Sequence, residues 1–395
     1  MAFIEKRGST FRIGVSCGYD SSGKQVKRYM TYKPQAGMTD RQIKKELDRV
    51  AVAFEEKCLH GSAAFRSAEK FETVANAYME HVEKNNLLRP RTVVRMKQLE
   101  PRTFHALGHI RIDKITTAQV QSFIDNLAEP GVNQRTGGGL SAKSQKHYLS
   151  FVSDVFEYAI RLGMATGNPC EHVDTKKLEH KEHEIYTLDE LQALLDALQA
   201  DAPPQYFTFF MLAAYTGLRR AELLGLEWSD IDFKTGVLNV SRTSLYTKEL
   251  GQFTDTTKTK GSQRALKLPE SVLANLKAYK AIQAERALKC GDQWHHTNRL
   301  FTKWNGEPMN SNTPYNFLLK FCREHGLRFI GVHGFRHTNA SLLIASGADV
   351  KTVSENLGHS QVSTTLDIYS HSIETARAAA SDAVSAMIDG KRKVK

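Results

Sequence analysis

Residues 3–33 alternate apolar and polar positions, and the alternation is interrupted by the turn-forming stretches RGS and DSSGK. A period of two is typical of short antiparallel strands. The next segment, TDRQIKKELDRVAVAFEEK, begins at Thr39 and repeats apolar residues every three or four positions, which predicts a helix. These apolar positions are Ile43, Leu47, Val50 and Phe54. We therefore expect residues 1–66 to form a small α+β domain of three strands and one helix.

A helical period replaces this alternation from Phe71 onward. One apolar stripe consists of Phe71, Val74, Ala75, Tyr78, Met79 and Val82, and a second of Tyr148, Leu149, Val152, Val155, Phe156, Ala159 and Ile160. Two further helical segments, PRTVVRMKQLEPRTFHALG and TTAQVQSFIDNLAE, lie between them. The pattern predicts an all-α domain of four or five helices over residues 67–168.

The polar segment GNPCEHVDTKKLEHKEHEIY begins with a Gly-Asn-Pro stop and has no hydrophobic period, so residues 169–186 are predicted to link two domains. Thr187 and Glu190 then form a capping-box pattern that starts a helix. With the strand-like GVLNVSRTSLY further on, residues 187–373 are expected to form a mixed, mainly α-helical domain with a small antiparallel sheet. Residues 374–395 contain an apolar stripe in ETARAAASDAVSAMIDG, which predicts a C-terminal helix before the basic tail KRKVK.

Charge narrows the choice of partner. The chain has 54 Lys plus Arg against 43 Asp plus Glu, a net charge of +11, and residues 1–66 alone hold 13 basic against 7 acidic residues. This balance suits a polyanion, first nucleic acid and second an anionic membrane surface.

The longest nearly apolar run, FTFFMLAAY, is far shorter than the ~20 residues of a membrane span. The start MAFIEKRGST lacks an apolar signal core, and the five cysteines lie far apart without zinc-binding spacing, so we expect a cytoplasmic protein with reduced thiols and no membrane partner.

Four short clusters in the C-terminal half carry candidate chemistry. In LAAYTGLRRAELLGLEWSDID, an apolar helix stops at Thr216 and Gly217, and a new helix starts with Arg219. Arg219 and Glu222 are three residues apart, so they share a helix face and the carboxylate can orient the guanidinium. Taken alone, an ordinary surface ion pair explains this pattern equally well.

The second cluster, TKTKGSQRALKLPE, follows strand-like residues. Gly261 and Ser262 supply a turn signal, so a hairpin can carry Lys258 or Lys260 at its tip. A lysine on an exposed hairpin is ordinarily only solvated, and it gains a chemical role if an anion lies beneath it.

In the third cluster, VHGFRHTNASLLIASG, three polar residues are spaced i, i+3 and i+4 at the start of a predicted helix: His333, Arg336 and His337. They can point the same way, and the N–H groups and dipole of a helix N-terminus favour phosphate. The two histidines also have the i, i+4 spacing of a metal site, but Gly334 stands where a zinc-protease helix has glutamate.

In the fourth cluster, LGHSQVSTTLDIYSH, His359 lies in a turn after Gly358, and Tyr369 follows in a polar context. Alone, such a tyrosine is most often a packing residue. Together the clusters supply two arginines, a lysine, histidines and a tyrosine, the groups needed to move a phosphodiester onto a phenol oxygen. Arginines can neutralise the negative charge of the transition state with paired hydrogen bonds, and a lysine can protonate the leaving 5′ oxygen. A phosphotyrosine intermediate conserves the energy of the broken bond.

In order and approximate spacing, TGLRRAE, KTKGSQR, HGFRH and LGHSQVSTTLDIY resemble the motifs of tyrosine recombinases, in particular phage and conjugative-transposon integrases. The resemblance implies an arm-DNA-binding domain in residues 1–66, a core-DNA-binding domain in 67–168 and a catalytic domain in 187–373. It also implies roles for the site residues: clamp arginines Arg219 and Arg336, general acid Lys258 with Lys260 as the alternative, catalytic histidines His333 and His359, supporting residues Glu222 and His337, and nucleophile Tyr369.

The same resemblance implies a site-specific DNA recombinase of a mobile element, acting through a 3′-phosphotyrosine intermediate and a Holliday junction, with no cofactor and no metal ion. Its expected partners are double-stranded DNA at core and arm sites, further copies of the chain in a tetrameric synapse, and accessory DNA-bending proteins at the bacterial nucleoid. The helix in residues 374–395 is expected to dock on a neighbouring subunit, with packing in cis as the alternative.

Other interpretations stay open at this point. Within the enzymes they are a related DNA-resolving recombinase and a type IB topoisomerase-like enzyme. From other classes they are a catalytically silent DNA-binding protein and a metalloenzyme that uses His333, His337 and His359.

Overall fold

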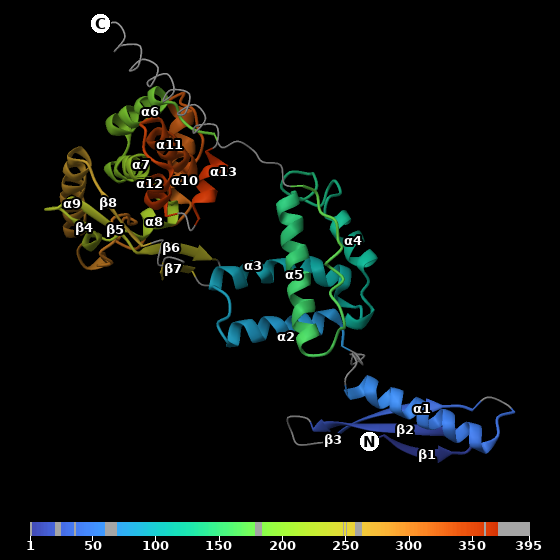
Figure 1. The fold of residues 1–395 in the computed structure, drawn as a ribbon. Coiled ribbons are helices and arrows are strands. Elements are labelled where there is room, and N and C mark those ends of the chain that lie inside the picture. The colour runs from blue at the N-terminus through green and yellow to red at the C-terminus, as the bar shows by residue number, and fades with distance from the viewer. Residues whose placement is uncertain are drawn as a thin grey trace, which may run out of the picture. The chain divides into compact units, whose positions relative to one another are not determined.

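The computed structural model describes residues 2–19, 25–34, 37–59, 69–177, 184–247, 249, 251–256, 263–358 and 361–369. The chain divides into two compact units, residues 1–179 and 180–395. Helices dominate, and the described strands form small antiparallel sheets (Figure 1). The protein is therefore a multidomain, mostly helical chain, as its sequence pattern predicted.

The N-terminal unit begins with a small sheet covered by a helix. The strands β1 (Phe3–Arg7), β2 (Thr10–Tyr19) and β3 (Gln25–Tyr32) pair in the order β1-β2-β3, and α1 (Asp40–Leu59) lies along the sheet (Figure 1). Because side chains alternate between the faces of a strand, one face packs its apolar residues against α1. The buried residues of this core are Ile13, Leu47 and Ala51.

The opposite face of this sheet carries Phe3, Arg12 and Tyr29. The guanidinium carbon of Arg12 lies 3.6 Å from the centre of the Tyr29 ring, a cation–π contact, and the rings of Phe3 and Tyr29 meet edge to face at 6.1 Å. Gly14 makes room for this packing, since a Cβ there would lie 2.3 Å from the Phe3 ring. Phe3 and Tyr29 are both exposed, so this face presents aromatic and basic groups to solvent.

The rest of the described N-terminal unit is helical. Its α-helices are α2 (Phe71–Lys84), α3 (Pro90–Thr103), α4 (Thr117–Asn126) and α5 (Ala142–Arg161). A π-helical turn, Phe104–Gly108, continues α3, and a 3-10 turn, Ile112–Lys114, precedes α4. The two apolar stripes of the sequence meet in one core, where the ring centres of Phe71 on α2 and Phe156 on α5 lie 6.0 Å apart.

The segment predicted as a linker, residues 169–186, is folded at both of its ends. Cys170 is buried in the helical core of the N-terminal unit. Tyr186 is buried in the C-terminal unit, where its hydroxyl donates to the carbonyl oxygen of Arg328 at 3.0 Å. The division between the units falls between residues 179 and 180, within this segment, and residues 178–183 lie outside the described part of the chain.

The C-terminal unit is built mainly from helices. Among its described residues the α-helices are α6 (Leu188–Asp201), α7 (Pro204–Thr216), α8 (Arg220–Gly225), α9 (Glu270–Cys290), α10 (Thr313–Glu324), α11 (Val332–Ala345), α12 (Val350–Leu357) and α13 (Val362–Ile368). Thr187 and Glu190 form the predicted capping box at the start of α6. The apolar run FTFFMLAAY lies in α7, which is buried along most of its length, with Phe209 and Phe210 fully inaccessible.

The described strands of this unit form two small antiparallel sheets. One has the strand order β4 (Ile231–Asp232), β5 (Val237–Val240), β8 (Arg264–Lys267), and the other pairs β6 (Arg242–Thr247) with β7 (Gly251–Thr256).

The strands on either side of the predicted turn at Gly261 and Ser262, β7 and β8, do not pair with each other. β7 pairs with β6, whereas β8 pairs with β5, so the chain reverses direction between Thr247 and Gly251 instead. Gly251 has a φ of +67°, a left-handed conformation that favours glycine, and it follows a short connection of the kind that closes hairpins. Lys258 and Lys260 lie between β7 and β8 in the sequence, outside the described residues.

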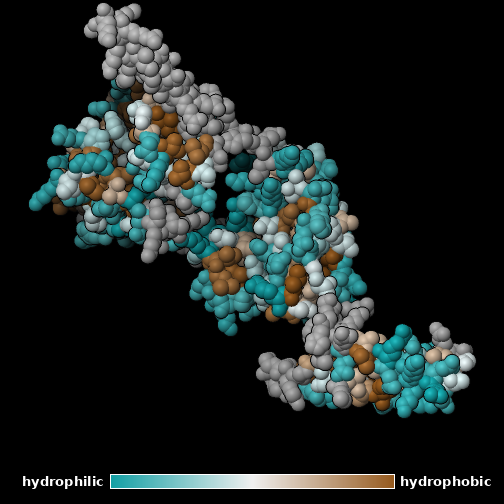
Figure 2. All heavy atoms as spheres, in the orientation of Figure 1, coloured by the Kyte–Doolittle hydropathy of each residue, from teal (hydrophilic) through white to brown (hydrophobic). Residues whose placement is uncertain are grey.

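The visible surface is mostly hydrophilic, with separate apolar patches (Figure 2). Across the described residues, no helix combines the length and apolarity that a membrane crossing requires.

Candidate active site

Arg219 stands at the junction of α7 and α8. Gly217 ends α7 with a φ of +60°, and Arg219 is the residue before the first turn of α8. Its backbone N–H donates to Oε2 of Glu222 at 2.9 Å, and its guanidinium Nη1 donates to Oε1 at 2.8 Å. Its Nη2 donates to the carbonyl oxygen of Gly358 at 3.1 Å. The pair expected from the sequence is formed, and it is also tied to the segment that leads to Tyr369.

Glu222 is only 2% exposed and binds a second arginine. Arg264 donates from Nη2 to Oε2 of Glu222 at 2.9 Å and from Nε to the carbonyl oxygen of Asn356 at 2.6 Å. Gly358 lies beside it: its φ is +65°, and a Cβ there would be 2.6 Å from Nη1 of Arg264. Burial alone raises the pKa of Glu222, but the hydrogen bond and charge of Arg264, together with Arg219, bring that pKa below its ordinary value.

The residue pattern did not single out Arg264, although the motif KTKGSQR contains it. Its partner Glu222 is 42 residues away in the sequence, so no local spacing relates the two. The only available signal was an arginine at the start of a strand, within a motif that already carried two candidate lysines.

Replacing Glu222 by glutamine is expected to lower the free energy of unfolding by about 3 kcal/mol at neutral pH, because the buried guanidinium of Arg264 loses its counter-charge. The folded-state pKa of Glu222 is lowered, so its stabilisation is present above the unfolded-state pKa and is lost as the pH falls through the folded-state pKa. The difference between variant and wild type should therefore shrink in acid. Denaturant unfolding of the full chain across this pH range measures it.

Glu285→Gln is the matched control, since Glu285 is 63% exposed and pairs with Lys289 on the surface of α9. This change is expected to have little effect at any pH. A Glu222→Gln penalty that stays constant from neutral pH into acid would contradict a role based on charge.

Arg336 is a buried cation on α11. Its side chain is 2% exposed, and Nη1 donates to the carbonyl oxygen of Gly217 at 3.0 Å. Among the described residues, none places an acceptor within hydrogen-bond distance of its buried Nη2. Burial, and then the positive charge of Arg219, lower the pKa of Arg336 to about 9. A buried guanidinium is stabilised when an anion binds to it. The paired N–H donors of the guanidinium match the spacing of two phosphate oxygens.

Tyr369 is buried next to this cation. It follows α13, is 4% exposed, and packs in an apolar cluster that includes Ile344 and Leu357. Its Oη lies 2.8 Å from Nδ1 of His337. Burial raises the pKa of Tyr369 to about 12, and the positive charge of Arg336 acts in the opposite direction.

The two histidines of α11 lie one turn apart in different surroundings. His333 is exposed, whereas His337 is 5% exposed. Their ring centres are 4.8 Å apart and their planes are nearly perpendicular, at 89°. His333 therefore reaches the surface, and His337 connects it to the buried hydroxyl of Tyr369.

The fold brings all the described candidate residues to one place. Those joined by the contacts above are Arg219, Glu222, His333, Arg336, His337 and Tyr369. Three candidates, Lys258, Lys260 and His359, lie outside the described residues, as does the helix expected in residues 374–395. Within the described ranges, no three His, Cys, Asp or Glu side chains converge as metal ligands would.

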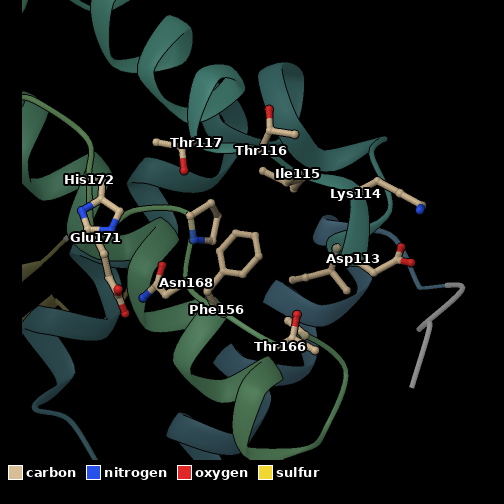
Figure 3. Close-up of a pocket in the computed structure, with 14 residues that line it drawn as sticks. Asp113, Lys114, Ile115, Thr116, Thr117, Phe156, Thr166, Asn168, Glu171 and His172 are labelled. Carbon is tan, nitrogen blue, oxygen red and sulfur yellow. The ribbon is translucent and has the colours of Figure 1, made fainter. Parts of the chain in front are cut away.

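A hollow of about 510 Å³ lies in the helical part of the N-terminal unit (Figure 3). It is lined by residues at the start of α4, by Phe156, and by the segment that follows α5. Two of its polar side chains have partners within the protein: Asn168 Nδ2 donates to Ser153 Oγ at 2.9 Å and to Glu157 Oε1 at 2.8 Å, and Thr116 caps α4. We assign these groups to holding the helices together.

Comparison with known proteins relates this geometry to one family. Residues 184–375 match the model of the phage integrase family, and residues 71–176 match that of the phage integrase central domain. The chain is 31% identical over 261 residues to the ICEBs1 integrase of Bacillus subtilis (strain 168), and the match covers 66% of this chain and 68% of that protein.

Solved structures share the fold. A Tn1549 transposon integrase in complex with transposon right end DNA has a TM-score of 0.64 at 22% identity, covering 79% of this chain and 99% of that one. A lambda integrase tetramer bound to a Holliday junction has a TM-score of 0.56 at 19% identity, covering 91% and 95%. At these identities the likeness is one of fold.

Proposed function

The chain belongs to the phage integrase family, and from this premise we infer that the site around Arg336 and Tyr369 is where it cuts and rejoins DNA. It is a tyrosine recombinase, a site-specific DNA breaking and rejoining enzyme of mobile elements. One observation carries the assignment of the site: the buried Nη2 of Arg336 has no acceptor among the described residues. The positive charge of this guanidinium also lowers the pKa of the buried Tyr369 hydroxyl, against the effect of burial.

In this proposal Arg219 and Arg336 clamp the scissile phosphate. Each guanidinium also donates to a protein carbonyl, from Gly358 and Gly217 respectively, which fixes its orientation. Negative charge grows on the phosphoryl oxygens in the transition state, and two preorganised guanidinium forks neutralise it. Glu222 orients Arg219 through two hydrogen bonds and supports the clamp without touching DNA.

Tyr369 is the proposed nucleophile. Its Oη attacks phosphorus, which forms a 3′-phosphotyrosine and releases a 5′ oxygen. We propose Lys258, with Lys260 as the alternative, as the general acid that protonates this oxygen, and His333 and His359 as further phosphate-binding residues. The phosphotyrosine conserves the bond energy, so rejoining needs no nucleotide cofactor, and the scheme contains no step for a metal ion. Exchange of strands through a Holliday junction would complete recombination.

The proposed partners are double-stranded DNA and further copies of the chain. The lambda integrase structure is a tetramer bound to a Holliday junction, and we propose a tetrameric synapse here, assisted by DNA-bending proteins at the nucleoid. We propose that residues 374–395 of a neighbouring copy dock in the pocket of about 890 Å³ between α6, α7, α9 and α11. Core DNA would be held by residues 67–168 and 187–373, and arm DNA by residues 1–66.

Arg12→Ala is expected to weaken binding to arm-site DNA roughly tenfold while leaving core-site cleavage unchanged, because Arg12 lies on the exposed face of the β1-β2-β3 sheet. Arm sites can be selected from random duplexes with the full-length protein, and fluorescence anisotropy measures affinity. Lys45→Ala removes one positive charge from the exposed side of α1 and should weaken binding less. Equal losses for the two variants would contradict an arm-binding sheet face and point to a general effect of charge.

Covalent capture tests the assignment of the site. The protein is incubated with fragmented genomic DNA in the presence of a chelator, denatured, and separated from fragments that are not covalently bound. We expect recovered fragments to share one cleavage sequence and peptide mapping to place the adduct on Tyr369. A nicked duplex of that sequence, called the suicide duplex below, then traps the adduct permanently.

The other outcomes distinguish the alternatives. Absence of any adduct would leave a silent DNA-binding protein, and an adduct lost only in chelator would favour a metalloenzyme. Adducts without sequence preference, together with relaxation of supercoiled plasmid, would favour a topoisomerase-like enzyme.

A further inference from the structure

The proposed cleavage requires a group that takes the proton of Tyr369. A phenol that forms an ester with phosphorus must lose its hydrogen, and burial raises the pKa of this phenol to about 12. At neutral pH only ~10⁻⁵ of such a hydroxyl is ionised, so a base in direct contact makes a large difference. Among the residues that the structure describes, the basic side chain within hydrogen-bond distance of Oη is His337.

We propose that His337 is a catalytic residue whose Nδ1 accepts the phenolic proton of Tyr369 during cleavage and returns it during rejoining. The proposal rests on the function proposed above for this site. It goes beyond the supporting role that the motif resemblance implies for His337, because it assigns this residue a proton-transfer step at the nucleophile itself.

Atoms and charge are conserved in the proposed step. The Oη–H bond of Tyr369 breaks and its proton moves to Nδ1 of His337, while a new bond forms between Oη and phosphorus. The bond between phosphorus and the 5′ oxygen breaks, and that oxygen takes a proton from the general acid, proposed as Lys258. The phosphodiester is converted into a phosphotyrosine diester of the same charge, His337 gains one positive charge, and the lysine loses one. Rejoining reverses each transfer.

The neighbouring groups fit this division of roles. Arg219 and Arg336 are guanidinium cations without a lone pair to offer, so they can bind the phosphate but cannot accept the proton. A neutral imidazole that carries its hydrogen on Nε2 presents a lone pair at Nδ1, the atom that lies 2.8 Å from Oη. The negative charge of the bound phosphodiester would offset the charge that His337 acquires.

His337→Asn is the informative variant, because the amide oxygen of asparagine can still accept a hydrogen bond from Oη but is not basic. We expect adduct formation on the suicide duplex to slow about 10²–10³-fold, with unchanged affinity for the duplex. His296→Asn is the matched control, since His296 is exposed and lies outside the site, and it should react at the wild-type rate.

A more acidic nucleophile separates proton transfer from positioning. A trifluorinated tyrosine introduced at position 369 of the full-length chain has a far more acidic phenol and needs less help from a base. With this nucleophile, the chain that keeps His337 and the His337→Asn variant should form the adduct at nearly the same rate. A defect of positioning would persist unchanged, because the fluorinated ring occupies the same place.

Each outcome has a distinct meaning. If wild type forms no adduct, the function proposed for the site fails. If wild type forms it and His337→Asn is equally fast, the function stands and the proton-transfer role of His337 is refuted. If His337→Asn is slow with both nucleophiles, His337 only positions Tyr369, which also overturns the proposal.

Discussion

Tyr369→Phe is expected to yield a protein that binds the suicide duplex as wild type does and forms no covalent adduct. The change removes one atom, Oη, and leaves the ring in its apolar cluster with Leu357 and Ile344. Without that atom no phosphotyrosine can form, so the loss should be complete. A denaturing gel measures the adduct, and anisotropy measures binding.

The hydroxyl also makes a buried hydrogen bond to His337, so Tyr369→Phe should lower stability by about 1–3 kcal/mol. Tyr279→Phe controls for this effect, because Tyr279 is a buried tyrosine of the same unit whose hydroxyl donates to the carbonyl oxygen of Leu300 at 2.8 Å. It should lose stability but keep cleavage. An adduct formed by Tyr369→Phe would mean that another residue is the nucleophile.

The second large effect is expected for Arg336→Lys, which should retain DNA binding and reduce cleavage about 10³-fold or more. Arg336 uses Nη1 to hold the carbonyl oxygen of Gly217 and directs a second nitrogen, Nη2, elsewhere. A lysine has one ammonium group and cannot serve both directions, so either the anchor or the phosphate contact is lost. Single-turnover cleavage of the suicide duplex measures the effect.

Arg299→Lys provides the comparison for Arg336→Lys. Arg299 is also nearly buried, at 6% exposure, and it contacts Glu227, Thr254 and the carbonyl of Gly225 away from the site. Its replacement should destabilise the unit without slowing cleavage by the folded fraction. Equal loss of cleavage in both variants would show that destabilisation, and not a missing phosphate contact, explains the result.

Local patterns were sufficient to predict the parts of the molecule whose physical causes are local. The capping box of Thr187 and Glu190 and the contact between Arg219 and Glu222 both span three residues, and both occur as expected. The apolar stripes that predicted α2 and α5 are the residues that fill one core, because a helix must bury its apolar side against another element.

Contacts between distant residues were beyond this kind of reasoning. Arg264 and Glu222 meet only because strand and helix pack together, and His337 reaches Tyr369 across 32 residues through the packing of α11 with α12 and α13. The hairpin was misplaced because two glycines offered turns, and the conformation that distinguishes Gly251 is a property of the folded backbone.

Gly358 shows how little tolerance for substitution this site has. Even an alanine there would press its methyl group against Arg264 and would have to adopt a strained backbone angle. The displacement would pass along Arg264 to Glu222, and through the carbonyl of Gly358 to Arg219. One extra carbon atom at a residue that takes no part in the reaction would thus displace both the arginine that is proposed to bind phosphate and the segment that leads to Tyr369. We therefore expect active members of the family to keep glycine at this position.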